Sequence, residues 1–377
     1  MLEKNGEAEQ SGTRDGGLMV RSVAQNQRAI QGTDSPPPLA APRHLPLWYL
    51  FKAMRPRQWT KNLLVFAGVV FAQRALDFAA LGRAAGAFVV FCLLSSMIYL
   101  INDLSDLESD RQHPTKQYRP LASGQLQVPV ALIGVGLLAA LAVMLTVLLA
   151  AWPAAAGPGQ SLHLTLSPLR LTVAASPPSP PDTQYGVLGN LGGGRWLFAI
   201  VAASFVVLNL AYTFRLKHVV ILDVFCIAAG YVVRAMAGAV VIPVPISPWL
   251  YLCAIFLSLF LALGKRRQEL LLLEADAGLH RRVLLDYSPQ LLDQMILIVT
   301  SATVMSYSLY TFQSTTGNHR LMVTIPFVLY GIFRYLYLIY NKMEGGSPEE
   351  ILLRDKHVLS AVALCVLSML ALLYLSF

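Results

Sequence analysis

Long apolar runs, separated by short polar segments, dominate this chain of 377 residues. A transmembrane α-helix needs about 20 predominantly apolar residues, with a range of about 17–25. Nine runs approach this description, at residues 62–79, 84–102, 129–151, 195–214, 219–242, 248–264, 291–312, 321–340 and 357–376. The first is the weakest, because Arg74 and Asp77 interrupt it. The pattern predicts an all-α polytopic membrane protein built as a bundle of about nine transmembrane helices.

Two segments depart from this pattern. Residues 1–44 are polar and include three consecutive prolines, so we expect a disordered tail that precedes a transmembrane catalytic domain at 45–377. Within that domain, residues 45–54 form either a surface helix or part of the first span. Residues 152–194 form a long connection rich in Pro, Gly and Ser. Leucines alternate with polar residues on both sides of Pro168, which favours a short hairpin, and an unstructured insertion is the alternative.

The composition and the charge distribution agree with this class. Hydrophobic residues make up 55% of the chain and charged residues only 13%, which excludes an ordinary soluble domain. With nine spans and the N-terminus inside, seventeen Lys and Arg residues fall in the inner segments and five in the outer ones. This positive-inside bias predicts a plasma-membrane protein with a cytoplasmic tail, an extracytoplasmic 152–194 insertion and an outer C-terminus. It also accounts for the net charge of +8 without a nucleic-acid partner.

The most informative polar segment follows the second apolar run. On a continuing helix, Asn102, Asp106 and Asp110 are spaced i, i+4 and i+8, so they share one face. Crowded carboxylates repel one another, and their oxygen atoms suit Mg²⁺ when a substrate phosphate completes its coordination. The cations Lys116 and Arg119 come soon after the acids. The combination predicts a diphosphate site on the cytoplasmic face, and a solvated helix end bearing acids is the alternative.

Two further inner connections bring polar residues to the same end of the bundle. These residues are Tyr212, Arg215, Lys217, Lys265, Arg266 and Arg267. Asp223 and Arg234 lie within the fifth apolar run, where an ionisable side chain is unfavourable unless it faces a cavity or a partner. Asp223 is therefore either a substrate ligand or a structural tie to Arg215 or Lys217.

The acidic segment has the pattern Asn-Asp-x-x-Asp-x-x-x-Asp and lies at the inner end of the second of nine spans. It resembles the first motif of the UbiA-type prenyltransferase superfamily. Its extension through Lys116 and Arg119 to Gly124 narrows the resemblance, as do four other motifs. These motifs are Arg55-Pro-Arg-Gln-Trp59-x-Lys61-Asn62, Gly264-Lys-Arg-Arg-x-Glu269, Ser306-Tyr-x-Leu-Tyr310 and Arg354-Asp355-Lys356. From about residue 46 to 377, without the 152–194 insertion, the set resembles the decaprenyl-phosphate phosphoribosyltransferase branch.

This resemblance implies transfer of 5-phosphoribose from phosphoribosyl diphosphate to a polyprenyl (decaprenyl) phosphate, with release of diphosphate, in the synthesis of cell-wall arabinan precursors. It implies that Asp103, Asp106 and Asp110 are catalytic and hold Mg²⁺ together with Asn102. It also implies a set of substrate-binding residues: Lys61, Asn102, Lys116, Arg119, Tyr212, Lys217, Asp223, Lys265, Arg266 and Arg267. A homo-oligomer is compatible with the resemblance.

One departure from the superfamily is informative. Its aromatic prenyltransferases carry a second acidic motif, Asp-x-x-x-Asp, on the fifth span, but here Asp223 is followed four residues later by Ile227. Cations in the inner connections suit the heavier phosphate load of a phosphoribosyl donor and a lipid phosphate. One alternative is a prenyltransferase that joins a polyprenyl diphosphate to an aromatic or quinone precursor. An alternative of another class is a membrane transporter that uses Asp223 and Arg234 as a relay.

Overall fold

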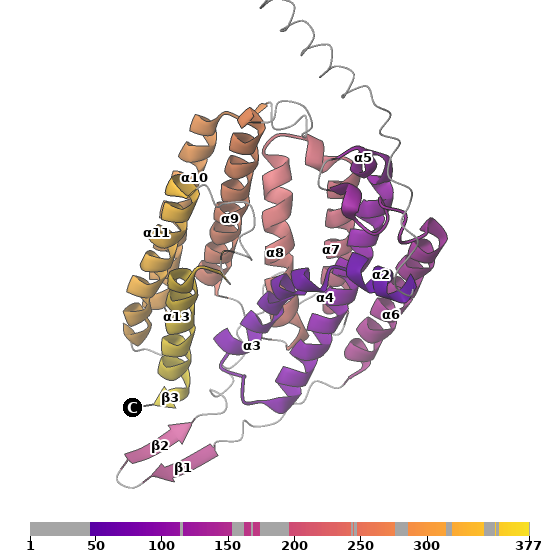
Figure 1. The fold of residues 1–377 in the computed structure, drawn as a ribbon. Coiled ribbons are helices and arrows are strands. Elements are labelled where there is room, and N and C mark those ends of the chain that lie inside the picture. The colour runs from indigo at the N-terminus through magenta and orange to yellow at the C-terminus, as the bar shows by residue number, and fades with distance from the viewer. Residues whose placement is uncertain are drawn as a thin grey trace, which may run out of the picture.

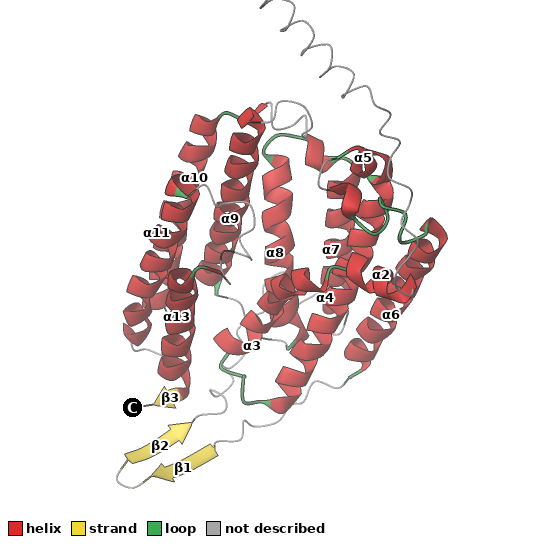
Figure 2. Cartoon of the chain, viewed as in Figure 1, coloured by secondary structure: helices red, strands yellow, loops and turns green. Residues whose placement is uncertain are grey.

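The computed structural model describes residues 46–113, 116–152, 162–166, 169–173, 196–242, 244, 247–275, 286–313, 319–342, 351 and 354–376. The tail expected at 1–44 lies outside the described residues, as does most of the 152–194 insertion. Helices form the bundle, and the described strands lie beyond one of its ends (Figure 2).

Eight helical segments of the described residues are long and apolar enough to cross a membrane. They are α4 (Phe78–Ser105), α6 (Val128–Ala151), α7 (Leu197–Phe214), α8 (Leu222–Val241), α9 (Pro248–Ala275), α10 (Pro289–Phe312), η5 (His319–Thr324) continued by α11 (Ile325–Asn341), and α13 (Lys356–Tyr374). Each corresponds to one of the predicted apolar runs after the first. The prediction of an all-α polytopic bundle with about nine spans is confirmed.

The first predicted span takes a different form from the others. A separate helix, α2 (Pro46–Ala53), precedes it, which supports the surface-helix interpretation of residues 45–54. The chain then turns at Arg55, whose φ of 54° is left-handed, and enters the 3₁₀-helix η1 (Pro56–Phe66) and the short helix α3 (Ala67–Phe71). The expected span at 62–79 is therefore wrong in its boundaries and in its type of helix.

This segment nevertheless runs along the bundle from one end to the other. Arg55 contacts Asp103 near the C-terminal end of α4, whereas Arg74 donates a hydrogen bond to the carbonyl of Ile242, which follows α8. Arg83, twenty residues before Asp103 and so about 30 Å away along α4, also reaches the end of α8. A 3₁₀-helix rises about 2.0 Å per residue, so relatively few residues cover this depth.

Two glycines let this segment pack closely against α8. A Cβ atom at Gly238 would lie 1.8 Å from the carbonyl oxygen of Val65, and one at Gly68 would lie 2.7 Å from the backbone of Gly238. Neither contact leaves room for a side chain, so glycine is required at both positions. The apolar sequence of the first run carries no signal of this close approach.

Two apolar cores lie on either side of α8, which stands between the two groups of helices in Figure 1. One core is formed mainly by α4, α6 and α7 with η1, and the other by α9, α10, α11 and α13. Ala237 of α8 belongs to the first core, and Val224 of the same helix belongs to the second. Large apolar side chains that point away from both cores, such as Ile133 and Leu297, are exposed as lipid-facing positions require.

The described part of the 152–194 insertion contains the expected hairpin. Strands β1 (Leu162–Leu166) and β2 (Leu169–Val173) pair antiparallel, with Leu166 opposite Leu169. The last residues of the chain, β3 (Leu375–Ser376), add a third strand to β2. Figure 1 shows this sheet and the C-terminus at the end of the bundle opposite the short helix α5 (Leu107–Gln112). The acidic segment and the insertion therefore lie at opposite ends.

Candidate functional site

The acidic segment begins where α4 ends. Asp106 has φ −96° and ψ 10° and interrupts the helix between α4 and α5. Its N–H still donates to the carbonyl of Asn102 at 2.9 Å, and the N–H of Asp110 donates to the carbonyl of Asp106 at 2.8 Å. The expectation of one continuous helix through these residues is wrong at Asp106, although the backbone hydrogen bonds keep their i, i+4 spacing.

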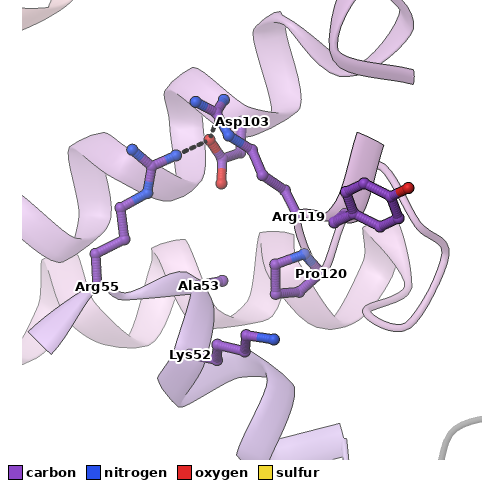
Figure 3. A pocket seen from close by; sticks show the side chains of 7 residues that line it. Lys52, Ala53, Arg55, Asp103, Arg119 and Pro120 are labelled. Atoms are coloured by element: carbon purple, nitrogen blue, oxygen red, sulfur yellow. Dashed lines mark hydrogen bonds and ion pairs between the residues drawn. The ribbon is translucent and has the colours of Figure 1, made fainter. Parts of the chain in front are cut away.

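Arg119 joins Asp103 to Asp110. Its Nη1 lies 3.2 Å from Oδ1 of Asp103 and also forms an ion pair with Oδ2 of Asp110. Arg55 approaches the same oxygen of Asp103 through Nη2 at 2.5 Å, and Figure 3 shows both guanidinium groups directed at this carboxylate. Both aspartates are buried, but 28% of the Arg55 side chain and 26% of that of Arg119 are exposed. Water and small anions can therefore reach the cations that hold the carboxylates.

Asp106 has a different cationic partner. Its Oδ1 lies 2.9 Å from Nζ of Lys217, which comes from the connection η3 (Leu216–His218) between α7 and α8. Nζ of Lys116 lies 3.9 Å from Oδ1 of Asp110. Asp103 and Asp110 therefore share one cation and Asp106 has another, a pairing that the i, i+4 and i+8 spacing of Asn102, Asp106 and Asp110 does not specify. We call the seven charged residues the acid–cation site: Arg55, Asp103, Asp106, Asp110, Lys116, Arg119 and Lys217.

A cavity of about 250 Å³ opens beside Asp103. Its lining consists of Lys52, Ala53, Arg55, Asp103, Tyr118, Arg119 and Pro120 (Figure 3). Three cations and one carboxylate give this wall a net positive charge, which favours an anionic ligand. Lys52, Arg55 and Tyr118 were not among the predicted site residues. Arg55 begins one of the motifs that carry the resemblance, whereas Lys52 and Tyr118 had only weak signals as a Lys before the first span and a Tyr beside the expected Arg119.

The oxygen atoms of this segment have the chemistry that Mg²⁺ prefers. Among the described residues, no three Asp, Glu, His or Cys side chains are grouped so that they could hold a metal ion as they stand. The reason is that each aspartate faces a cation. The donor set therefore fits Mg²⁺, provided that the carboxylates exchange ammonium and guanidinium partners for the ion. The assignment of Asn102, Asp103, Asp106 and Asp110 as metal ligands stays a prediction.

A second charged cluster lies on α8 and α9, and its central pair is fully buried. Nε of Arg266 lies 2.6 Å from Oδ2 of Asp223, and the two side chains are 1% and 0% exposed. Arg266 also pairs with Glu269 and donates to the hydroxyl of Tyr212 at 3.2 Å. The interpretation of Asp223 as a structural tie is supported, but the partner is Arg266 rather than Arg215 or Lys217. The resemblance implied that Asp223 and Arg266 contact the substrate directly. In this arrangement neither side chain has surface that a substrate could reach.

Tyr287 completes this buried cluster. Its hydroxyl donates to Oδ1 of Asp223 at 2.7 Å and accepts from the N–H of Ile221 at 2.7 Å. Ile221 has φ 68°, a strained value for a β-branched residue, and this hydrogen bond helps to hold it. Burial, together with the neighbouring Asp223 carboxylate, raises the pKa of the Tyr287 hydroxyl, so it stays protonated and remains a donor.

The remaining predicted substrate-binding residues have local partners. The segment around Lys265, expected to be a loop, lies within the helix α9, where Lys265 is 4.0 Å from Glu269. Arg267 pairs with Asp293 at 2.6 Å and lies over the ring of Tyr340. Lys61 lies on η1, beside Asn62, which contacts α4 about three helical turns from Asp103. The partners of Arg267 therefore lie outside the acid–cation site, and substrate contact by Lys61, Lys265 or Arg267 stays a prediction.

Comparison with known sequences gives consistent matches. Residues 63–162 match the UbiA prenyltransferase family. The decaprenyl-phosphate phosphoribosyltransferase of Corynebacterium glutamicum is 33% identical over 327 residues, which is 84% of this chain and 83% of the relative. The enzyme of the same name from Mycolicibacterium smegmatis is 34% identical over 322 residues, covering 81% of this chain and 86% of the relative.

Comparison with solved structures supports the same fold. A UbiA homolog from Archaeoglobus fulgidus bound to GPP and Mg²⁺ superposes with a TM-score of 0.58 at 16% sequence identity. The match covers 86% of this chain and 99% of that chain. At this identity the likeness concerns the fold, and the chemistry must come from the residues of the site.

Proposed function

Because this chain belongs to the UbiA prenyltransferase family, we propose that it transfers 5-phosphoribose from phosphoribosyl diphosphate to decaprenyl phosphate or a similar polyprenyl phosphate. The names of relatives that match most of this chain support this reaction. The observation that carries the proposal is the charge of the acid–cation site, where four cations surround three aspartates. Reachable positive charge suits a donor that bears a diphosphate and a 5-phosphate.

In this reaction the bond between ribose C1 and the diphosphate oxygen breaks, and the diphosphate leaves with the electron pair. A new bond forms between C1 and an oxygen of the lipid phosphate. Positive charge develops on the ribose ring, and the carboxylates of Asp103, Asp106 and Asp110 stabilise it electrostatically. The acceptor phosphate is already an anion, so no general base is needed to generate the nucleophile.

Asn102, Asp103, Asp106 and Asp110 would hold Mg²⁺, which would supply positive charge to offset that of the departing diphosphate. Arg55 and Arg119 would then pair with donor phosphate oxygens, which a planar guanidinium binds in a bidentate manner. Lys116 and Lys217 are the nearest further cations and would hold the remaining phosphate charge. The assignment of each cation to one phosphate is not needed for the proposal.

Helix α8 supports a phosphoribosyl donor over a polyprenyl diphosphate donor. Ile227, at the position of the second acid of the missing motif, packs against the apolar core of α8, α9, α10 and α11. Asp223 is paired with Arg266. All residues of α8 are described, and they offer no second pair of carboxylates for the metal ions of a prenyl diphosphate. A transporter relay is also disfavoured, because Asp223 and Arg234 have separate partners.

We further propose that the acid–cation site faces the cytoplasm, where the highly charged donor is available. The excess of Lys and Arg in the inner segments supports this orientation. The insertion hairpin and the C-terminus, at the opposite end of the bundle, would then be extracytoplasmic.

A transfer assay tests the proposed function. The purified chain is incubated with labelled phosphoribosyl diphosphate and decaprenyl phosphate, with Mg²⁺ or with a chelator. We expect label in the lipid fraction only with Mg²⁺. A parallel reaction contains a polyprenyl diphosphate and an aromatic acid. Product from this second pair, with none from the first, would contradict the proposal.

A further inference from the structure

Arg234 is a buried cation whose charge no carboxylate of the described residues balances. It lies on α8, is 7% exposed and has no acidic partner among the described residues. Nε donates to Oδ1 of Asn62 at 2.7 Å, and Nη1 donates to the carbonyl of Gly230 at 2.6 Å. The rings of Phe205 and Tyr231 lie 4.6 and 5.7 Å from the guanidinium carbon. A guanidinium has five N–H donors, so three of them have no hydrogen-bond partner in the described residues.

Such an arrangement is unfavourable inside a membrane-spanning bundle. Arg266, another deeply buried arginine, has two carboxylate partners, Asp223 and Glu269. Arg83 lies near the start of α4 and donates hydrogen bonds to the carbonyl groups of Val241 and Trp152 at the ends of helices. Arg234 alone of these three combines a mid-helix position with an unbalanced charge. An intramembrane ionisable residue in this situation is a candidate for a functional site.

The neighbours of Arg234 orient it rather than neutralise it. Asn62 is fully buried, accepts from Arg234, and donates through Nδ2 to the sulfur of Cys92 at 3.3 Å. The hydroxyl of Ser95 lies 3.4 Å from the same oxygen of Asn62. These contacts from η1 and α4 hold the guanidinium on one side and leave Nη2 as its unbonded end.

Arg234 lies deeper in the bundle than the acid–cation site and close to the same helix, α4. Asn62, which accepts a hydrogen bond from Arg234, also contacts Cys92 and Ser95 of α4, which precede Asp103 by eleven and eight residues. Arg234 therefore lies about two to three helical turns from Asp103 along the direction of α4, toward the membrane interior. Tyr99 stands between the two levels, with Arg55 4.9 Å above its ring. Arg234 is thus on the membrane-interior side of the acids.

We infer that Arg234, oriented by Asn62, binds the phosphate headgroup of the lipid acceptor. This inference rests on the proposed function, which requires a lipid phosphate to approach ribose C1 from the membrane side of the donor. A phosphate supplies the negative charge and the several acceptor oxygens that the three unbonded N–H groups lack. The donor phosphates have their own cations in Arg55, Lys116, Arg119 and Lys217.

The test measures binding independently of turnover. Thermal stabilisation of the purified full chain in detergent is recorded with polyprenyl phosphate, with the polyprenol of equal length and with inorganic phosphate. We expect the lipid phosphate to stabilise the wild type more than either other compound does. In Arg234→Gln, affinity for polyprenyl phosphate should fall about tenfold to a hundredfold, to the level of polyprenol, since a charge-assisted hydrogen bond is lost. In Asn62→Ala, the same preference should be weakened without a change in charge.

Two further variants keep the test decisive. Arg83→Gln removes another buried arginine at the far end of α4, and it should retain the preference for phosphate over polyprenol. Arg234→Lys keeps the charge and should retain part of the preference, which covers the case in which Arg234→Gln fails to fold. A preference that persists at the wild-type level in Arg234→Gln, or that is lost equally in Arg83→Gln, would overturn the inference. Equal stabilisation by inorganic phosphate would identify a free anion instead of a lipid as the ligand and would also overturn it.

The outcome is distinguishable from failure of the proposed function. If the wild type transfers phosphoribose but Arg234→Gln keeps its KM for the lipid, this inference fails and the proposed function stands. If the wild type binds lipid phosphate through Arg234 but transfers no phosphoribose, the proposed function fails and the binding site stands.

Discussion

Asp103 and Asp223 are both buried aspartates paired with arginine, but the partners differ in their access to water. Arg55 and Arg119, which hold Asp103, are each exposed by more than a quarter of their side chain, whereas Arg266, which holds Asp223, is 1% exposed. An anion can reach the first pair of arginines and compete with the carboxylate. It cannot reach Arg266 without local opening. The aspartate–arginine pairs of the acid–cation site can therefore exchange partners with a ligand, whereas the Asp223–Arg266 pair attaches α8 to α9.

The largest effect should come from breaking the buried pair. Asp223→Leu leaves Arg266 buried with only Glu269 as a carboxylate partner, and removing one member of a buried ion pair costs about 3–5 kcal/mol. We expect a large fall in the thermal midpoint and in the folded yield of the purified protein. The double variant Asp223→Leu, Arg266→Met replaces the pair by apolar side chains and should recover much of the stability.

One result for Asp223→Leu would contradict its structural role. If Asp223→Leu folds with normal stability but loses affinity for phosphoribosyl diphosphate, Asp223 is a substrate ligand, as the resemblance implied, and the structural interpretation is wrong.

The acid–cation site should respond in the opposite way. Asp106→Asn removes a charge from a partly exposed side chain that faces Lys217, so the protein should fold normally. We expect turnover to fall by about two to three powers of ten, the size of a major electrostatic contribution to catalysis. The matched control is Glu108→Gln, two residues away, whose carboxylate is 81% exposed and pairs with Arg111. Near-normal turnover of Asp106→Asn at saturating Mg²⁺ would remove Asp106 from the metal-binding set.

The smallest effect should come from removing the ion pair between Asp355 and Arg334 of α11. Asp355 pairs with Arg334 at 2.8 Å and accepts hydrogen bonds from the N–H groups of His357 and Val358 at the start of α13. The hydrogen bond from Arg334 lowers the pKa of Asp355 from 3.8 to about 2. Because the folded-state value is depressed, the stabilisation is fully present above about pH 4 and is lost as the pH falls toward about 2.

Thermal unfolding at two pH values measures this contribution. Asp355→Asn should lower the thermal midpoint by a few degrees at pH 7, and the difference from wild type should shrink at pH 3. The effect is expected to be small, because the pair is partly exposed to solvent. A difference that grows on acidification would show that the sign of the pKa shift is wrong.

Much of the fold was predictable from the sequence, because eight apolar runs of sufficient length need only their own residues to form helices. The path of η1 was not predictable, since it depends on the contact of Gly68 and Gly238, which lie far apart in the sequence. The acids of the site, together with Lys116 and Arg119, were predicted from their clustering around residues 102–119, whereas Arg55 was not among the predicted site residues. The pairing of acids with cations was not predictable, because the spacing of the acids does not specify that Arg119 contacts both Asp103 and Asp110. The Asp223–Arg266 contact joins two different helices, so no local pattern in the sequence indicates it.

The measurement that tests this account most directly is donor binding by two arginine variants, one from each kind of environment. Arg119 contacts the acids at a reachable site, whereas Arg267 pairs with Asp293 away from it. With Mg²⁺ present, titration calorimetry should show that Arg119→Ala raises the Kd for phosphoribosyl diphosphate by about tenfold or more, since a charge-assisted contact is lost. Arg267→Ala should bind the donor as the wild type does. Unchanged binding in Arg119→Ala together with weakened binding in Arg267→Ala would contradict the assignment of the donor to the acid–cation site.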